Sequence, residues 1–99
     1  MILVRDIFHL KFGKAKDARL LLKEATDIGV KHGFEKIRAL TDLITGHSYT
    51  LILESQWNSL ADWESAAKKG TAAEDWQKWY AKFSPLVESA SREVLNILD

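Results

Sequence analysis

The spacing of apolar residues switches between a strand period and a helix period, and this most constrains the fold. From Ile2 to Phe12 apolar and polar residues alternate, which is the period-two pattern of a β-strand. Residues 14–33 repeat apolar side chains every three or four positions, as an amphipathic helix does, and Gly33 is placed to end it. Because 99 residues are enough for one domain only, we expect a single α+β domain over residues 1–99.

The rest of the chain predicts a β-α-β-β-α-β order. Residues 35–44 and 48–57 alternate around a short glycine-containing break, which is typical of a β-hairpin. The order is that of the ferredoxin-like fold, and we therefore expect a four-stranded antiparallel sheet with helices on one face. The elements expected after the hairpin are a helix over 59–69 capped by Asn58 or Ser59 and ended by Gly70, a helical segment over 71–83, a fresh helical start or kink at Pro85 in residues 84–90, and a closing strand over 91–98.

The two faces of the predicted sheet differ in character. The face expected under the helices is apolar and collects Val4, Phe8, Leu10, Leu51, Leu53 and Trp57. The opposite face mixes charges with apolar residues that favour burial, and it collects Leu3, Arg5, Ile7, His9, Arg38, Leu40, Asp42, Ile44, Ile52, Glu54 and Gln56. A homodimer in which two such open faces pack together would bury the apolar residues and pair the charges. The alternative is a monomer with a half-exposed antiparallel sheet, which is common.

Composition and charge exclude several classes of function. The formal charge is zero, with 14 basic and 14 acidic residues, so a nucleic-acid partner is not expected. The chain has no cysteine, which excludes disulfides and thiolate chemistry. No apolar run approaches the roughly 18 residues of a membrane span, and the first six residues lack the pattern of a signal peptide. We therefore expect a cytoplasmic protein without a membrane partner.

His9, Arg5 and Glu54 form the sharpest candidate catalytic group. They fall on one side of the sheet if the first and third strands are neighbours, as the predicted fold requires. A histidine beside a carboxylate can act as a general base near neutral pH. The alternative is a structural network of ion pairs across a dimer interface. The histidines show no metal-ligand spacing, so we expect neither a metal site nor a cofactor.

The aromatic residues suggest a ligand pocket. Tyr49, Trp57, Trp63 and Trp76 are expected to wall a cavity between helices and sheet for a small hydrophobic, aromatic ligand. Trp76 is followed at three and four positions by further aromatic residues, which share one helical face. Alternatively, these large side chains simply fill the core of a small domain.

Residues 49–98 carry a resemblance to known proteins. Their features are a strand that ends in an aromatic residue, the helix start SLADWE, the segment DWQKWY, a proline and a last strand rich in branched residues. Together with GKAKDARLLLKEA after the first strand, they resemble the dimeric α+β barrel proteins of the NIPSNAP-like, antibiotic-biosynthesis monooxygenase and stress-responsive types. The resemblance implies that two sheets face each other in a dimeric barrel. Some members are cofactor-free oxygenases or haem-degrading enzymes, so the resemblance alone would allow haem ligation by His9 or His47.

Two functions follow from the sequence, and both stay open. The first is a small cofactor-free oxygenase or isomerase that acts on a hydrophobic aromatic compound, with His9 or Glu54 active only if the pocket reaches their face of the sheet. The second is a non-catalytic ligand-binding or assembly domain, in which the polar sheet face only fixes the homodimer. A cavity with a titratable group at its wall would favour the enzyme.

Overall fold

In the computed structural model, which describes residues 1–34 and 37–98, four strands form one antiparallel sheet. The elements in chain order are β1 (Ile2–Leu10), α1 (Ala15–Lys31), β2 (Arg38–Thr41), β3 (Thr50–Trp57), α2 (Leu60–Ala72), α3 (Glu74–Phe83), the short 3-10 helix η1 (Ser84–Leu86) and β4 (Val87–Asn96). The strand order in the sheet is β2-β3-β1-β4. This order and the β-α-β-β-α-β sequence of elements confirm the predicted ferredoxin-like fold.

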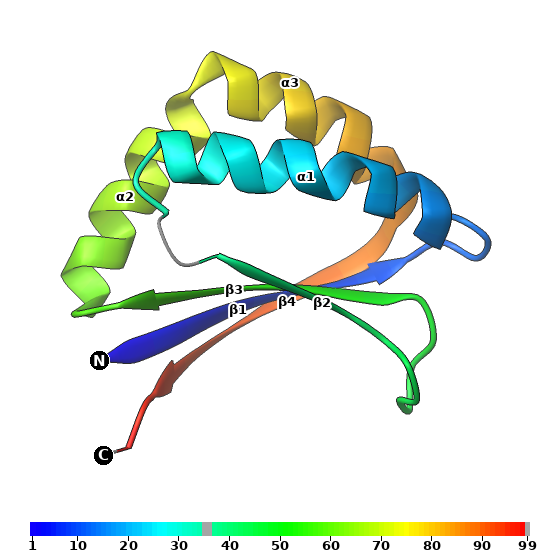
Figure 1. Cartoon of the computed structure of the whole chain (residues 1–99), viewed down its shortest axis with the longest axis horizontal. Coiled ribbons are helices and arrows are strands. Elements are labelled where there is room, and N and C mark those ends of the chain that lie inside the picture. Colours follow the sequence, from blue (N-terminus) through cyan, green and yellow to red (C-terminus); the bar gives the residue numbers. More distant parts are fainter. Residues whose placement is uncertain (35–36, 99) are drawn as a thin grey trace.

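Within the described residues, the helices cover one face of the sheet only (Figure 1). Between this face and the helices lies a core of buried residues, Leu10, Ala18, Ala25, Leu51, Trp79 and Phe83. Phe83 of α3 meets Phe8 of β1 edge-on, with ring centres 5.0 Å apart. The indole Nε1 of Trp79 donates a hydrogen bond to the Leu21 carbonyl oxygen at 2.9 Å. The apolar alternation of β1 therefore marks the helix-covered face, as predicted. None of the described helices is long and apolar enough to cross a membrane.

The hairpin differs from its predicted extent. β2 pairs with β3 only from Arg38 to Thr41, whereas the prediction ran over 35–44; residues 35–36 lie outside the described part of the chain. Beyond Thr41 the two segments stay joined through Asp42: its N–H donates to the Thr50 carbonyl oxygen at 3.1 Å, and its carboxylate accepts hydrogen bonds from the backbone N–H groups at positions 49 and 50, at 3.2 and 3.0 Å. The following residues turn into a loop, and Leu43 and Ile44 are both 93% exposed. Ile44 is thus not a residue of the open sheet face, which corrects the prediction.

Three further boundaries differ from the sequence prediction. Helix α2 passes through Gly70 and ends at Ala72. The Oγ of Ser59 caps this helix by accepting the Asp62 N–H at 3.2 Å, so of the two predicted caps the serine is the one used. After α3, residues 84–86 form one 3-10 turn and the last strand begins at Val87, because its amides pair with β1 instead of continuing a helix. The first strand ends at Leu10 and leaves Phe12 exposed.

Candidate functional site

A cavity of about 110 Å³, open on one side to solvent, lies between the helices and the helix-covered face of the sheet. All three helices contribute to its wall, together with β1, β3 and β4. Its apolar lining includes Ala25, Ile28, Phe34, Leu53, Trp63 and Trp76. Ligand sites in proteins are concave and mostly apolar, with a few placed polar groups, and this cavity has that character.

Two glycines help to form the cavity wall. A Cβ added to Gly29 of α1 would lie 2.2 Å from Ile37 Cδ1, so the glycine lets the helix and this side chain approach closely. A Cβ added to Gly70 of α2 would meet Phe34 Cε1 at 3.5 Å, an ordinary contact. Gly70 therefore has room for a methyl group, and that room belongs to the cavity.

One ion pair forms part of the cavity wall on the sheet. Asp6 of β1 and Arg92 of β4 are cross-strand partners on the helix-covered face, and Arg92 Nε donates a hydrogen bond to Asp6 Oδ1. The guanidinium carbon of Arg92 lies 5.0 Å from the ring centre of Trp63, within the range of a cation–π contact. A charged group facing apolar surroundings needs a partner, and here each charge supplies one for the other.

A second polar contact closes the wall between α1 and α3. His32, directly after α1, lines the cavity, and its Nε2 lies 2.9 Å from Asp75 Oδ1 in the first turn of α3. Lys31 Nζ is 3.4 Å from the other carboxylate oxygen. The hydrogen bond with His32 holds the pKa of Asp75 below its ordinary value, against a smaller opposing effect of partial burial. His32 thus caps the C-terminus of α1 and also joins this helix to α3.

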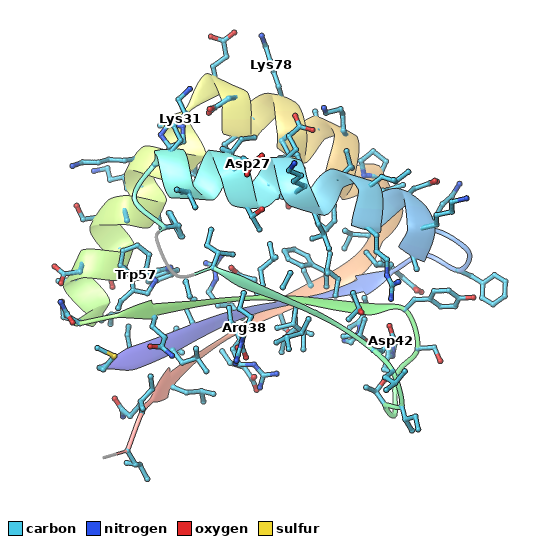
Figure 2. All side chains as sticks on the ribbon, in the orientation of Figure 1. Asp27, Lys31, Arg38, Asp42, Trp57 and Lys78 are labelled. Atoms are coloured by element: carbon cyan, nitrogen blue, oxygen red, sulfur yellow. The ribbon has the colours of Figure 1, made fainter. Side chains whose placement is uncertain are left out.

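The structure brings two of the four predicted pocket residues together. Trp63 and Trp76 line the same cavity. Trp57 extends toward the helix-covered side (Figure 2), but it borders a separate surface depression, and its Nε1 donates a hydrogen bond to Ser55 Oγ at 2.8 Å. Tyr49 lies beyond the other end of the sheet, where its ring packs edge-on against Phe12 at 5.3 Å between centres.

On the open face, Arg5 and Glu54 meet as predicted, within a row of charges that crosses all four strands. Glu54 is only 6% exposed and lies between Arg38 of β2, whose Nε donates a hydrogen bond at 3.0 Å, and Arg5 of β1, whose Nε is 3.1 Å away. Arg5 Nη1 in turn donates to Glu93 Oε1 of β4 at 3.4 Å. Figure 2 shows Arg38 extending to the side of the sheet away from the helices.

His9 shares this face but does not lie beside the carboxylate of Glu54. Its strand partner is Thr50, whose Oγ1 is 3.4 Å from His9 Nδ1, while Arg5 is the partner of Glu54. The His9 ring instead packs against that of His47, with 3.8 Å between centres. Among residues 1–34 and 37–98, no group of three or more His, Asp or Glu side chains is arranged to hold a metal ion.

Two charged residues of the cavity wall, Asp6 and Arg92, are absent from the sequence prediction, and so is Asp75, which pairs with the cavity residue His32. Asp6 could have been found from the sequence, because it lies between Val4 and Phe8 on the strand face that is otherwise apolar in β1. A carboxylate at such a position needs a partner or a ligand. Arg92 had no comparable signal, since the face of β4 follows from its pairing with β1.

The fold is that of several solved structures, although the sequence matches no protein-family model and no curated protein. A NIPSNAP family protein from Agrobacterium tumefaciens superposes with a TM-score of 0.90 at 22% identity, over 99% of this chain and 93% of that protein. An uncharacterized NIPSNAP domain protein from Burkholderia xenovorans gives 0.79 at 16% identity, over 99% and 95% of the two chains. A structure described as an antibiotic biosynthesis monooxygenase gives 0.77 at 10% identity over both whole chains. The chain thus has the α+β fold that these NIPSNAP and monooxygenase-type proteins share, as the sequence resemblance predicted.

Proposed function

We propose that this domain binds a small hydrophobic molecule, aromatic and about one ring in size, in the cavity under the helices. The observation that carries the proposal is an apolar cavity walled by Trp63 and Trp76, in which the Asp6–Arg92 ion pair lies beside the Trp63 indole. Its volume of about 110 Å³ is close to that of an engineered apolar cavity, about 150 Å³, that holds benzene in another protein. Because this cavity is open on one side, a substituent on the ring can extend into solvent.

The ion pair gives the cavity one polar side. Asp6 can accept a hydrogen bond from a ligand hydroxyl, and the guanidinium N–H groups of Arg92 that do not contact Asp6 can donate to a ligand oxygen. A ring stacked beside Trp63 would lie next to both groups, since Arg92 already contacts that indole. A phenol therefore suits the site better than a purely apolar ring of the same size.

More specifically, we propose that the domain oxidises its ligand as a monooxygenase. This step is suggested by the fold it shares with the structure described as an antibiotic biosynthesis monooxygenase. In such a reaction a phenol and O2 give a quinone and water, so one oxygen atom enters the substrate and the other leaves with two substrate hydrogens. Asp6 and His32 are titratable groups at the cavity wall that could accept the phenol proton. Glu54 also contributes to the cavity wall, whereas a catalytic role for His9 and Arg5 would need a ligand at the open sheet face, and the role of all three stays a prediction.

A titration with p-cresol followed by ¹H–¹⁵N NMR tests the binding proposal. Saturable shifts of the indole N–H signals of Trp63 and Trp76, with little change at Trp57, are the expected result, and Trp57 serves as an internal control. Ala67→Leu, which enlarges a side chain of the cavity wall, should weaken binding without changing the Trp57 signal. Shifts that do not saturate, or that are equal at all indoles, would contradict the proposal and favour the assembly domain.

We also propose that the protein works as a homodimer joined through the open face of the sheet. The observation in favour is that this face combines ion pairs around the buried Glu54 with the half-buried apolar side chains of Leu3, Ile7, Leu40 and Ile52. Such a composition suits an interface between sheets better than a surface in water. The cytoplasmic location expected from the sequence stays a prediction.

A further inference from the structure

The charges on the open face alternate in sign along one line across the sheet. Arg38 pairs with Glu54, Glu54 with Arg5, and Arg5 with Glu93, each as directly opposite strand partners. Because the strand order is β2-β3-β1-β4, the line runs positive, negative, positive, negative from one edge of the sheet to the other. We call these four residues the charged row.

Apolar positions flank the charged row on both sides. One neighbouring line of strand partners contains Leu40, Ile52 and Ile7, and the other contains Leu3 and Leu95. Leu95 is 42% exposed, which is high for a leucine in a strand. The apolar lines can supply the burial that holds two sheets together, and the row between them can meet the same row of the second copy.

Two symmetric arrangements of facing sheets treat the charged row differently. A two-fold axis along the row would place every residue opposite its own copy, so that like charges face each other in all four positions. A two-fold axis along the strands reverses the order of the row, and each residue then faces a residue of opposite charge. In this second arrangement Arg38 meets the partner's Glu93 and Glu54 meets the partner's Arg5, each contact occurring twice, as an isologous interface requires.

We infer that the charged row selects the second arrangement and so determines how two copies of this chain join. The inference rests on the proposed homodimer and adds its orientation and the pairs that cross it. Like charges brought together at an interface are costly, whereas complementary ones fix the register and exclude other partners. The Arg38–Glu93 contact is the diagnostic one. Within one chain these residues lie on strands at opposite edges of the sheet, so only a second copy can bring them together.

Charge reversal at the two ends of the row tests the inference. Arg38 and Glu93 have exposed side chains, 70% and 46%, so Arg38→Glu and Glu93→Lys should each fold, as far-UV circular dichroism would verify. Each variant alone places like charges at both symmetric contacts and should raise the dimer dissociation constant at least about tenfold. In a one-to-one mixture of the two variants, a mixed dimer contains one chain of each. The glutamate introduced at position 38 of one chain then faces the lysine introduced at position 93 of the other, and the unchanged Glu93 of the first chain faces the unchanged Arg38 of the second. A heterodimer should then form with a dissociation constant within about tenfold of the wild-type value.

Sedimentation velocity and native mass spectrometry give the readout. The control is Glu74→Lys/Lys78→Glu, which exchanges an ion pair on the outer surface of α3 and should leave association unchanged. A wild-type protein that stays monomeric at about 100 μM, far above the micromolar dissociation constant of a modest complex, would overturn the homodimer and this inference with it. A wild-type dimer that tolerates both single variants, or variants that fail to form the heterodimer, would overturn the proposed orientation and leave the homodimer standing.

Discussion

Replacing Gly70 with alanine should stabilise the fold and weaken ligand binding at the same time. Gly70 lies inside α2, where glycine is about 1 kcal/mol less favourable than alanine. The added Cβ would meet Phe34 Cε1 at 3.5 Å, which is ordinary contact and brings no clash. Because Gly70 is close to the end of the helix, we expect a gain of about 0.5–1 kcal/mol in the free energy of unfolding.

The same substitution should weaken ligand binding, because it narrows the cavity. Gly70 lines it, so the new methyl group takes up part of a volume of about 110 Å³. A site that accepts a single ring with little space to spare should then bind p-cresol at least about fivefold more weakly, because one methylene changes affinity in a hydrophobic pocket by about 1–3 kcal/mol. A helix position that gives up stability to keep an open wall is what a ligand site requires and a packed core does not.

Gly33→Ala is the matched control. Gly33 lies beyond the end of α1 with a φ of +95°, so alanine there adopts an unfavourable backbone and should cost about 1–2 kcal/mol. It adds its Cβ to open space away from the cavity, and p-cresol binding should not change in the folded protein. Urea unfolding followed by circular dichroism measures both free energies. A destabilising Gly70→Ala, or one that binds p-cresol as the wild type does, would refute the reasoning.

Three further predictions concern polar groups around the same helices. The hydrogen bond from His32 lowers the pKa of Asp75, so the Asp75 carboxylate stabilises the fold above pH 3.8, its ordinary pKa, and this stability is lost as the pH falls through the lower pKa of the folded state. Asp75→Asn should therefore reduce the fall of the urea midpoint at acid pH. An unchanged fall of the midpoint would contradict this role of Asp75. Trp79→Phe shrinks a buried side chain and removes the donor to the Leu21 carbonyl oxygen of α1, so the free energy of unfolding in urea should fall by about 2–3 kcal/mol. A loss under about 1 kcal/mol would contradict this prediction. Asp6→Leu/Arg92→Met should keep stability within about 1 kcal/mol but lose p-cresol binding by NMR, and full retention of binding would remove the ion pair from the site.

The sequence alone predicts the fold well because the spacing of apolar residues reports which side of each element is covered. In β1 the alternation from Val4 to Leu10 separates the two sheet faces, and the structure follows it. The same signal fails in the hairpin, where alternation continues to Ile44 although pairing stops at Thr41. Alternation reports side-chain character and not where the chain turns; after Asp42, which still donates its N–H to the Thr50 carbonyl oxygen, Leu43 and Ile44 lie exposed in the loop.

The candidate site is less visible in the sequence because it depends on which elements meet. Trp63 and Trp76 could be assigned to a pocket from their aromatic character, but nothing in their spacing separates them from Trp57, which lies outside it. Trp57 is the last residue of β3, whereas Trp63 and Trp76 belong to α2 and α3, which the turn at Ala73 folds against each other over the sheet. Tyr49 was misplaced for a related reason, since its positive φ of 58° belongs to the loop and not to the strand.

The two faces of the sheet use charge in different ways, and the difference bears on function. On the open face the charged row contains as many acids as bases, in an order that only a second reversed copy matches completely. On the helix-covered face a single pair, Asp6–Arg92, stands where apolar neighbours would pack at least as well. Under the two proposals made above, these charges select what the chain meets, a second copy on one face and a polar group of a small ligand on the other.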